Sequence, residues 1–392
     1  MQAFVLEVAE ATLADLDDRL ARVRWPCGHL RGTDWLDGPD PAYLRSLTAY
    51  WRRGFDWRAQ ERLLNRFDHV RVQLDGTWVH AIHQRGRGPR PLPLVMTHGW
   101  PSTFAEFRHV IGPLSDPTAF GGDAADAFDV VVPSLPGFAF SDPLPSGSWS
   151  TVPALWAELM RQLGHERFGA HGGDIGGFVT NRLAVEFPDR LLGVHVHYPA
   201  EPHRADDVPL SHEEQAFLAA RPRGRETGGA YAHVHRSRPL TLAYALADSP
   251  VGLAAWITDK WWEWTDHDGD LEDAVTRDDL LTALTLYWAT GTAESSLQVY
   301  REWGLGVPPE HALDLYPATP AGVEPRPLPA GRSIAVPAGI AVCHVRYPRR
   351  FVDRAYADIR QWTELPKRGH FPALEQPGAL IEDIRSFFRS VR

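Results

Sequence analysis

The sequence predicts an α/β protein whose mostly parallel sheet is covered by helices on both faces. Short apolar runs typical of buried strands alternate with helical stretches between residues 90 and 200, and the same pattern returns after residue 339. Strands that alternate with helices are joined by crossover connections, which place them parallel in one sheet. Strand-like runs disappear between residues 201 and 313, where helical segments dominate. The 392 residues suffice for one large core and an accessory layer.

The first part of the chain is predicted to contain helices followed by a hairpin. Apolar residues recur at helical spacing through residues 5–65, and Asp40 followed by Pro41 is typical of a helix start. Residues 69–74 and 78–84 alternate between apolar and polar side chains. The dipeptide Asp75-Gly76 between them is a strong hairpin signal, so these two segments are expected to pair as antiparallel strands.

Six further strands complete a predicted sheet of eight. They are expected at residues 92–98, 128–134, 167–172, 191–197, 339–345 and 359–365. Helices are expected between and after them at 151–163, 177–187 and 377–391, with longer helices at 240–264 and 278–303. The helical block lies between the sixth and seventh strands, which is the position of a lid. The segment 316–338 is rich in Pro, Gly and Ala and predicts a surface excursion.

Bulk composition excludes several classes of protein. The net charge of −10 disfavours a nucleic-acid partner and gives no signal for an anionic membrane. No long uncharged apolar stretch could span a bilayer, and the N-terminus lacks the basic-then-apolar pattern of a signal peptide. The two cysteines, Cys27 and Cys343, imply no disulfide framework and fit a reducing compartment, so a cytoplasmic location is expected.

The chain contains 15 tryptophans. Because aromatic side chains carry large buried areas, core and interface packing is the ordinary explanation. An aromatic pocket for a bulky apolar substrate is the functional alternative.

The run Gly172-x-Asp174-x-Gly176 has the spacing of a nucleophile elbow, the sharp strand-to-helix turn that lifts one side chain into an active site. A predicted strand precedes it and a predicted helix follows it, as an elbow requires. Serine usually stands at the centre. An aspartate there favours attack on a saturated carbon, since the product is an ester that water can cleave. The alternative is a glycine-rich turn with a helix-capping aspartate.

Two other segments fit the same interpretation. His98-Gly99-Trp100-Pro101 ends the predicted strand at 92–98, where this type of fold supplies one oxyanion-hole amide; the residue after the nucleophile supplies the other. The two amides would be those of Trp100 and Ile175. His370 follows the last strand and precedes the last helix, which is the place of the general base in the Asp…His order of this hydrolase class.

Together these residues resemble the epoxide hydrolases of the α/β-hydrolase fold, in particular the microsomal-type branch. The matching stretches include LARVRWP at 20–26, HGWP at 98–101, PSLPGFAFSDP at 133–143, GGDIGG at 172–177, DSPVGLAAWITDKWWEW at 248–264, DDLLTALTLYWATGTAESSLQVYRE at 278–302 and GHFPALEQP at 369–377. The resemblance implies an N-terminal meander over 1–80, a hydrolase core over 81–200 and 314–392, and a helical lid over 201–313. It also implies a soluble member, because the chain lacks the anchor helix of the mammalian microsomal enzyme.

The resemblance supplies two further site residues. The family uses a pair of lid tyrosines that donate hydrogen bonds to the epoxide oxygen, and Tyr231 and Tyr300 fall at the matching places. Ring opening builds an alkoxide, which a phenol can both bind and protonate.

The resemblance breaks at the acid that normally supports the histidine. The family places this carboxylate shortly after the seventh of the eight strands, where this chain has His344 and Arg346 instead. A histidine base normally needs a partner that fixes its tautomer and stabilises the imidazolium. Glu201, after the sixth strand, and Asp353 are the substitutes that the sequence offers.

The resulting hypothesis is epoxide hydrolysis in two steps. Asp174 attacks an epoxide carbon while Tyr231 and Tyr300 hold the leaving oxygen, and His370 then activates water to cleave the ester into a vicinal diol. No metal or cofactor is needed. A haloalkane dehalogenase is the nearest rival, although Ile175 stands where those enzymes typically carry a halide-binding tryptophan. A non-catalytic binding protein on a hydrolase scaffold is the rival from another class.

The partner expected from the resemblance is a small-molecule epoxide, with neither nucleic acid nor membrane, and self-association into a homodimer is an open alternative. The Arg- and Pro-rich composition is typical of a high-GC actinobacterial source, where soluble members of the branch often belong to natural-product pathways, including antibiotic biosynthesis. With Trp256, Trp261, Trp262 and Trp264 in the lid, this favours a bulky aromatic or polyketide-like epoxide.

Overall fold

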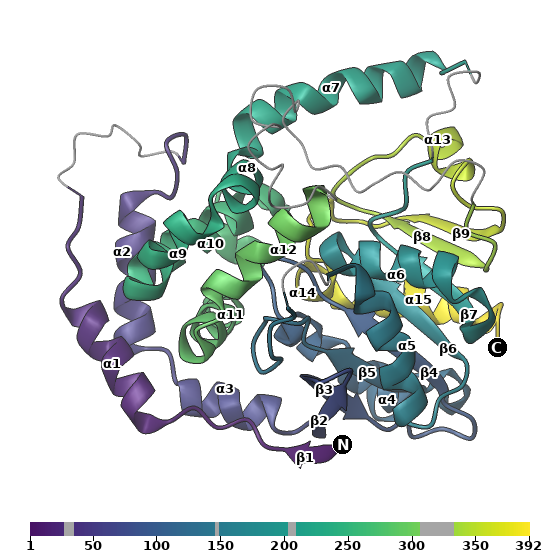
Figure 1. Ribbon diagram of the computed structural model, residues 1–392, viewed down its shortest axis with the longest axis horizontal. Coiled ribbons are helices and arrows are strands. Elements are labelled where there is room, and N and C mark those ends of the chain that lie inside the picture. The colour runs from purple at the N-terminus through teal and green to yellow at the C-terminus, as the bar shows by residue number, and fades with distance from the viewer. Residues whose placement is uncertain (27–34, 146–148, 203–208, 306–332) are drawn as a thin grey trace.

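The computed structural model confirms the predicted α/β class (Figure 1). It describes residues 1–26, 35–145, 149–202, 209–305 and 333–392. The described strands form one sheet in the order β1-β2-β3-β5-β4-β6-β7-β8-β9, parallel from β5 to β9 and antiparallel from β1 to the β3–β5 pair. The strands are β1 Gln2–Phe4, β2 His69–Leu74, β3 Thr77–Gln84, β4 Leu92–Thr97, β5 Phe128–Pro133, β6 Phe168–Gly172, β7 Leu191–Val196, β8 Ala338–Val342 and β9 Ile359–Glu364.

The sheet has nine strands where the sequence predicts eight. The additional strand, β1, has three residues and pairs antiparallel with β2 at the edge of the sheet. A segment this short carries no readable alternation of apolar and polar residues, so its pairing is decided by the neighbouring strand and not by its own pattern.

The predicted hairpin is confirmed as β2 and β3. Leu74 faces Thr77 across the pair, which leaves a two-residue loop. Asp75 and Gly76 have φ angles of +47° and +84°. Two successive residues with positive φ match the right-handed twist of the flanking strands, which explains the preference for Asp-Gly at this turn.

The helices occur close to their predicted places, with two corrections. They are α1 Glu10–Ala21, α2 Pro41–Arg53, α3 Trp57–Leu64, α4 Ile111–Ser115, α5 Val152–Gln162, α6 Asp174–Glu186, α7 His212–Gly228, α8 Ala230–Ser237, α9 Pro239–Asp248, α10 Pro250–Trp264, α11 Arg277–Thr290, α12 Ala293–Leu305, α13 Arg349–Asp353, α14 Pro372–Glu375 and α15 Pro377–Arg389. The single helices expected at 240–264 and 278–303 are each two helices. Pro250 ends the first helix by its missing amide hydrogen, and Gly291 ends the other at a φ of +65°.

Helices cover both faces of the sheet, as predicted. Side chains of β4 alternate between two cores, because successive residues of a strand point to opposite faces. One core joins Val95 to α5 and α6 through Trp156, Leu159, Val179 and Leu183. The other joins Leu94 and Met96 to α4 and α15 through Ile111, Ile384 and Phe387. Packing on both sides fixes the strand ends that carry the site.

Helices α7 to α12 lie between β7 and β8 in the chain and gather on one side of the sheet (Figure 1). Most of the predicted surface excursion at 316–338 lies outside the described residues. Its described end, 333–338, alternates between exposed and buried residues: Ser333 and Ala335 are exposed, whereas Ile334 is fully buried and forms a bridge with Tyr356.

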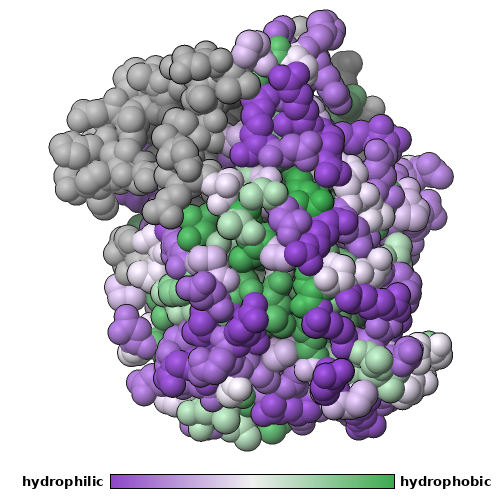
Figure 2. All heavy atoms as spheres, turned by 90° about the vertical axis from the view of Figure 1, so that its right-hand side faces the viewer, coloured by the Kyte–Doolittle hydropathy of each residue, from purple (hydrophilic) through white to green (hydrophobic). Residues whose placement is uncertain are grey.

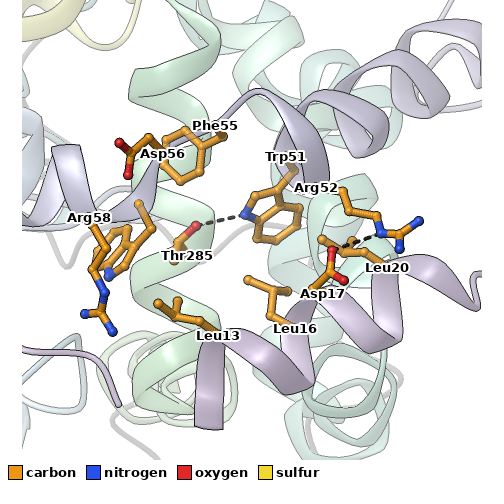
Figure 3. A pocket seen from close by; sticks show the side chains of 11 residues that line it. Leu13, Leu16, Asp17, Leu20, Trp51, Arg52, Phe55, Asp56, Arg58 and Thr285 are labelled. Carbon is orange, nitrogen blue, oxygen red and sulfur yellow. Dashed lines mark hydrogen bonds and ion pairs between the residues drawn. The ribbon is translucent and has the colours of Figure 1, made fainter. Parts of the chain in front are cut away.

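The N-terminal helices pack against lid helices, with α1 and α2 against α10 and α3 against α11. Figure 3 shows the cavity of about 200 Å³ that remains between them. The Trp51 indole donates a hydrogen bond of 2.9 Å to Thr285 of α11 beside it, and Arg52 pairs with Asp17 of α1. The first contact ties α2 to α11, and the second ties α2 to α1.

One face of the molecule, turned from the right-hand side of Figure 1, is mostly hydrophilic with an apolar strip through its middle (Figure 2). Among the described helices, no single one is long and apolar enough to cross a membrane. The pair α9 and α10 would qualify together by length and composition, but the two helices meet at an angle of 119°.

Substitutions at two glycines test whether the hairpin turn depends on the positive φ of Gly76. A Cβ added at Gly76 or at Gly378 would meet no atom within 4 Å. Gly76 has a positive φ, whereas Gly378 lies in the first turn of α15. We expect Gly76→Ala to lower the free energy of unfolding by about 1 kcal/mol and Gly378→Ala to raise it by about 0.5 kcal/mol. Urea denaturation measures both, and equal effects of the same sign would contradict the account.

Candidate active site

Asp174 lies at the carboxyl edge of the sheet, directly after β6, as the first residue of α6. Its φ is +49°, a left-handed conformation that is uncommon outside glycine. Non-glycine residues held in this region cluster at functional sites. The sharp turn predicted from the glycine spacing is therefore present, and α6 begins three residues before the expected position 177.

The glycines around the turn allow the start of α6 to approach the end of β4 closely. A Cβ at Gly176 would lie 1.8 Å from the backbone oxygen of Thr97, and a Cβ at Gly99 would lie 2.3 Å from Oδ1 of Asp174. Both positions exclude any larger residue, because the first contact is backbone and the second is the Asp174 carboxylate held by the turn.

Two backbone amides hold the Asp174 carboxylate. The amide of Trp100 donates a 2.9 Å hydrogen bond to Oδ1, and the amide of Ile175 also donates to the carboxylate. Burial raises the pKa of Asp174 to about 6, and these two amides oppose the rise by favouring the charged form. Trp100, Ile175 and Asp174 thus meet as the sequence predicts.

His98 fixes the loop that carries Trp100. Its Nδ1 donates to the oxygen of Gly99 at 3.0 Å, and its Nε2 accepts from the amide of Leu135 at 3.1 Å. Burial lowers the pKa of His98 to about 4, so the ring is neutral and can serve as donor and acceptor at once.

His370 lies on the other side of the carboxylate. Its Nε2 is 3.7 Å from Oδ2 of Asp174, and its backbone amide donates a 2.7 Å hydrogen bond to the oxygen of Trp264. One carboxylate oxygen is therefore bound by amides while the other faces the imidazole. Burial, reinforced by the nearby His344 and His197, lowers the pKa of His370 well below its usual range, so the ring is neutral near pH 7.

An imidazole lies where the resemblance places the acid that would support His370. His344 packs edge-on against the His370 ring with centroids 5.1 Å apart, in the loop after β8 where the resemblance places the acid. Asp353 does not fit the role, because it lies half-exposed on α13 and pairs with Arg349 at 2.7 Å. Glu201 is buried in the segment after β7. The groups that perturb the pKa of His370 are histidines.

Tyr231 of α8 and Tyr300 of α12 lie together above the site. Their rings are 5.7 Å apart, and the Tyr231 ring stacks on Trp100 at 5.1 Å and 8°. Burial raises the pKa of both phenols, and the charge of Asp174 adds to the rise, so both remain protonated. The Tyr300 hydroxyl is buried beside that of Tyr231, and the hydrogen bond between the two phenols partly opposes the rise in the pKa of Tyr231.

The sequence motifs assign no role to two buried residues near the site, His235 and Glu106. His235 is fully buried and contacts the rings of Trp100, Tyr231 and Tyr300 at 4.7–5.4 Å. Its place one helical turn after Tyr231 is the signal that could have found it. Glu106, in the 3₁₀ helix Phe104–His109, is buried near Asp174, and burial raises its pKa to about 8.

The four lid tryptophans divide into two groups. Trp264 lies 4.9 Å from the His370 ring and 5.2 Å from the Tyr231 ring, and Trp256 donates a hydrogen bond to His235. Trp261 instead stacks on Phe371, and Trp262 stacks on Trp35 at 4.1 Å. Only the first pair contributes to the aromatic surroundings of the site, while the second pair packs the structure.

A buried carboxylate fixes the loop of His370. Glu375 accepts hydrogen bonds of 2.8 Å from the amides of Phe371 and Asp266, and Asp266 in turn accepts from the amide of Arg368. The sequence contains Glu375 in a matching motif but gives no sign of this role, because Asp266 is 109 residues away. The network joins the loop after α10 to the histidine loop.

Comparisons with known proteins agree with the geometry of the site. Residues 1–107 match the family model described as the epoxide hydrolase N terminus, and residues 93–251 match that of the alpha/beta hydrolase fold. The chain is 41% identical to a putative epoxide hydrolase of Stigmatella aurantiaca, covering 99% of this chain and 85% of that protein. It is 31% identical to epoxide hydrolase 1 of Sus scrofa, covering 99% and 88%.

Solved structures agree with these matches. The structure of Aspergillus niger epoxide hydrolase superimposes with a TM-score of 0.79 at 26% identity, covering 100% of this chain and 96% of that one. The juvenile hormone epoxide hydrolase of the silkworm Bombyx mori gives 0.79 at 23% identity, covering 100% and 94%, and this second match supports the fold.

The Glu375 contacts predict a positioning role. Glu375→Gln keeps one oxygen acceptor but places an amide NH₂ group against the other of the two N–H donors, so we expect unfolding to cost about 1–3 kcal/mol less. We also expect slower turnover at unchanged KM, because His370 loses its fixed position without any loss of substrate contact. Glu382→Gln on the surface of α15 is the matched control, with no change in either measurement. If Glu375→Gln has the stability and turnover of the wild type, Glu375 does not position His370.

Proposed function

The chain belongs to the epoxide hydrolases, and we propose that it opens an epoxide to a vicinal diol through a covalent ester on Asp174. The observation that carries the proposal is the division of the carboxylate. Oδ1 accepts the Trp100 amide at 2.9 Å, whereas Oδ2 faces His370 at 3.7 Å. A carboxylate held in this way has one oxygen assigned to the amides and the other available for attack.

In the first step, Oδ2 of Asp174 attacks an epoxide carbon and the C–O bond of the ring breaks. The electron pair of that bond goes to the epoxide oxygen, which Tyr231 and Tyr300 bind, and a phenol proton neutralises it. The protonated state of both phenols and the buried Tyr300 hydroxyl support this role. The product is an alkyl ester whose carbonyl oxygen is Oδ1.

In the second step, His370 takes a proton from water, and the hydroxide attacks Cγ of Asp174. The negative charge develops on Oδ1, which already lies against the amides of Trp100 and Ile175. Fixed donors aimed at such a developing charge are worth several kcal/mol in a water-poor site. Collapse of the tetrahedral intermediate breaks the bond between Cγ and Oδ2, and the His370 imidazolium protonates Oδ2 as the diol leaves. The proton of the carboxylic acid left on Asp174 returns to the phenolate, so that Asp174, His370 and both tyrosines regain their starting states.

The substrate that we propose is a bulky aromatic or polyketide-like epoxide. The site is lined with the aromatic rings of Trp100, Tyr231, Trp264 and Tyr300, and His235 packs against the Tyr300 ring. Such surfaces favour flat apolar groups through stacking and edge-on contacts, each worth about 0.5–1.5 kcal/mol.

An isotope experiment tests the covalent step. In a single turnover in ¹⁸O-labelled water, the label is expected in Asp174 and not in the first diol, because water attacks Cγ and the diol keeps Oδ2. Mass spectrometry of the peptide and of the product measures both. In Asp174→Asn, turnover is expected to fall by at least about 10³-fold. Label in the first diol would exclude the ester.

The pKa values predict the pH dependence of alkylation. Asp174 attacks as the carboxylate, and its pKa of about 6 means that the alkylation rate falls about tenfold per pH unit below pH 6. Because burial lowers the pKa of His370 well below its usual range, we do not expect His370 to produce this limb. Rapid quench of a single turnover with an aryl epoxide measures the rate as mass added to the protein.

A control variant separates the two groups. His344→Gln removes a neighbour of His370 and leaves the Asp174 amides in place, so the limb near pH 6 is expected to persist. A limb near pH 4, the ordinary value for a carboxyl group, would contradict the buried environment assigned to Asp174.

A further inference from the structure

A second group of chemically reactive side chains lies at the edge of the sheet opposite to Asp174. His83 is near the end of β3, Asp129 is the second residue of β5, and His165 lies between α5 and β6. Since β3 runs antiparallel to β5, the end of β3 meets the start of β5. The three residues therefore gather at the amino ends of the parallel strands, whereas Asp174 follows the carboxyl end of β6.

The donor atoms of this group converge. Nε2 of His165 is 3.2 Å from Oδ2 of Asp129, and Nε2 of His83 is 3.8 Å from Oδ1. All three donor atoms lie within 4.8 Å of one another. The three side chains are at least nine-tenths buried. Both Nε2 atoms are buried and lie against the Asp129 carboxylate, whose charged form they favour, but neither forms a well-aligned hydrogen bond with a residue in the described ranges.

Buried imidazole nitrogens that lie against one carboxylate without well-aligned hydrogen bonds need an explanation, because buried polar atoms nearly always form good hydrogen bonds. Two imidazoles and a carboxylate are the donors that zinc prefers at sites with three protein ligands and one water. Donors around a tetrahedral zinc ion lie about 3.3 Å apart, given zinc–ligand distances of about 2.0–2.1 Å. The two measured separations lie close to this value.

We propose that His83, Asp129 and His165 form a binding site for Zn²⁺ or a similar divalent transition-metal ion. The ion would join β3, β5 and the segment before β6, and so stabilise the sheet at the edge away from the reaction. The sequence shows no metal-binding motif here, because the ligands are spread over 83 positions of the chain and only the fold brings them together.

The surroundings of Asp129 orient the carboxylate. The amide of Gly86 donates to Oδ1 at 3.2 Å, and the Arg85 guanidinium donates to Oδ2 at 3.0 Å. Such outer contacts commonly hold a ligating carboxylate in place. The Arg85 side chain is 62% exposed, so its charge is largely solvated. Its positive charge still opposes a bound cation, which gives a variant that alters affinity without removing a ligand.

Titration calorimetry with Zn²⁺ on the full chain, after chelator treatment and dialysis, tests the site. We expect one equivalent to bind the wild type, about 100-fold weaker binding in His83→Gln and His165→Gln, and tighter binding in Arg85→Gln. His212→Gln removes an exposed histidine of α7 and is expected to bind as the wild type does. Zinc should also raise the Tm of the wild type and not that of the two ligand variants.

The proposal is overturned if wild type, His83→Gln and His165→Gln bind zinc equally, or if the wild type binds less than one equivalent. Circular dichroism of each variant in chelator shows that it is folded. Should His83→Gln fail to fold, His165→Gln and Arg85→Gln decide the question, since His165 lies outside the strands and Arg85 is exposed.

Discussion

The buried carboxylate at the start of α6 is the constraint on which the rest of the site depends. Asp174 has a positive φ in a turn so tight that Gly99 and Gly176 can carry no side chain. Burial raises its pKa to about 6, and two backbone amides restore part of the lost solvation. Amides can do this without movement because β4 and β6 are neighbours in a sheet packed on both faces. A nucleophile that is both desolvated and fixed is more reactive than one in water.

The elements around the carboxylate follow from this constraint. Helices α8, α10 and α12 surround the site with aromatic residues, and burial keeps the phenols of Tyr231 and Tyr300 protonated. The histidine loop needs independent support, because His370 lies after the last strand and outside the sheet. Glu375 supplies that support through the amides of Phe371 and Asp266. The lid and the histidine loop are therefore joined by the same network, since Trp264 also accepts the amide of His370.

Local patterns predicted much of this arrangement. The Asp75-Gly76 turn, the elbow around Asp174 and the position of His370 were all visible as short signals, because each depends on backbone conformation or chain order. The roles of His235 and Glu375 and the meeting of His83 with His165 were not, since they depend on contacts between distant segments. The short strand β1 was missed for a related reason, because its neighbour decides its pairing. The position of Asp353 in the sequence also left it as a candidate acid. Its ion pair with Arg349 at the surface makes it unsuitable.

Within the described part of the chain, the neighbours that lower the pKa of His370 are the imidazoles of His344 and His197, and this separates the two halves of the proposed reaction. Alkylation needs Asp174, the phenols and a fixed geometry, and none of these depends on the charge of the histidine. Ester hydrolysis creates an imidazolium next to His344, which burial and a neighbouring imidazole disfavour. A histidine with a lowered pKa is a weaker base, which reduces the driving force for taking a proton from water. It is also fully in the neutral form that can accept this proton, which partly offsets the loss. Hydrolysis of the ester should therefore be the slower half of the cycle, and the amides on Oδ1 carry most of its transition-state stabilisation.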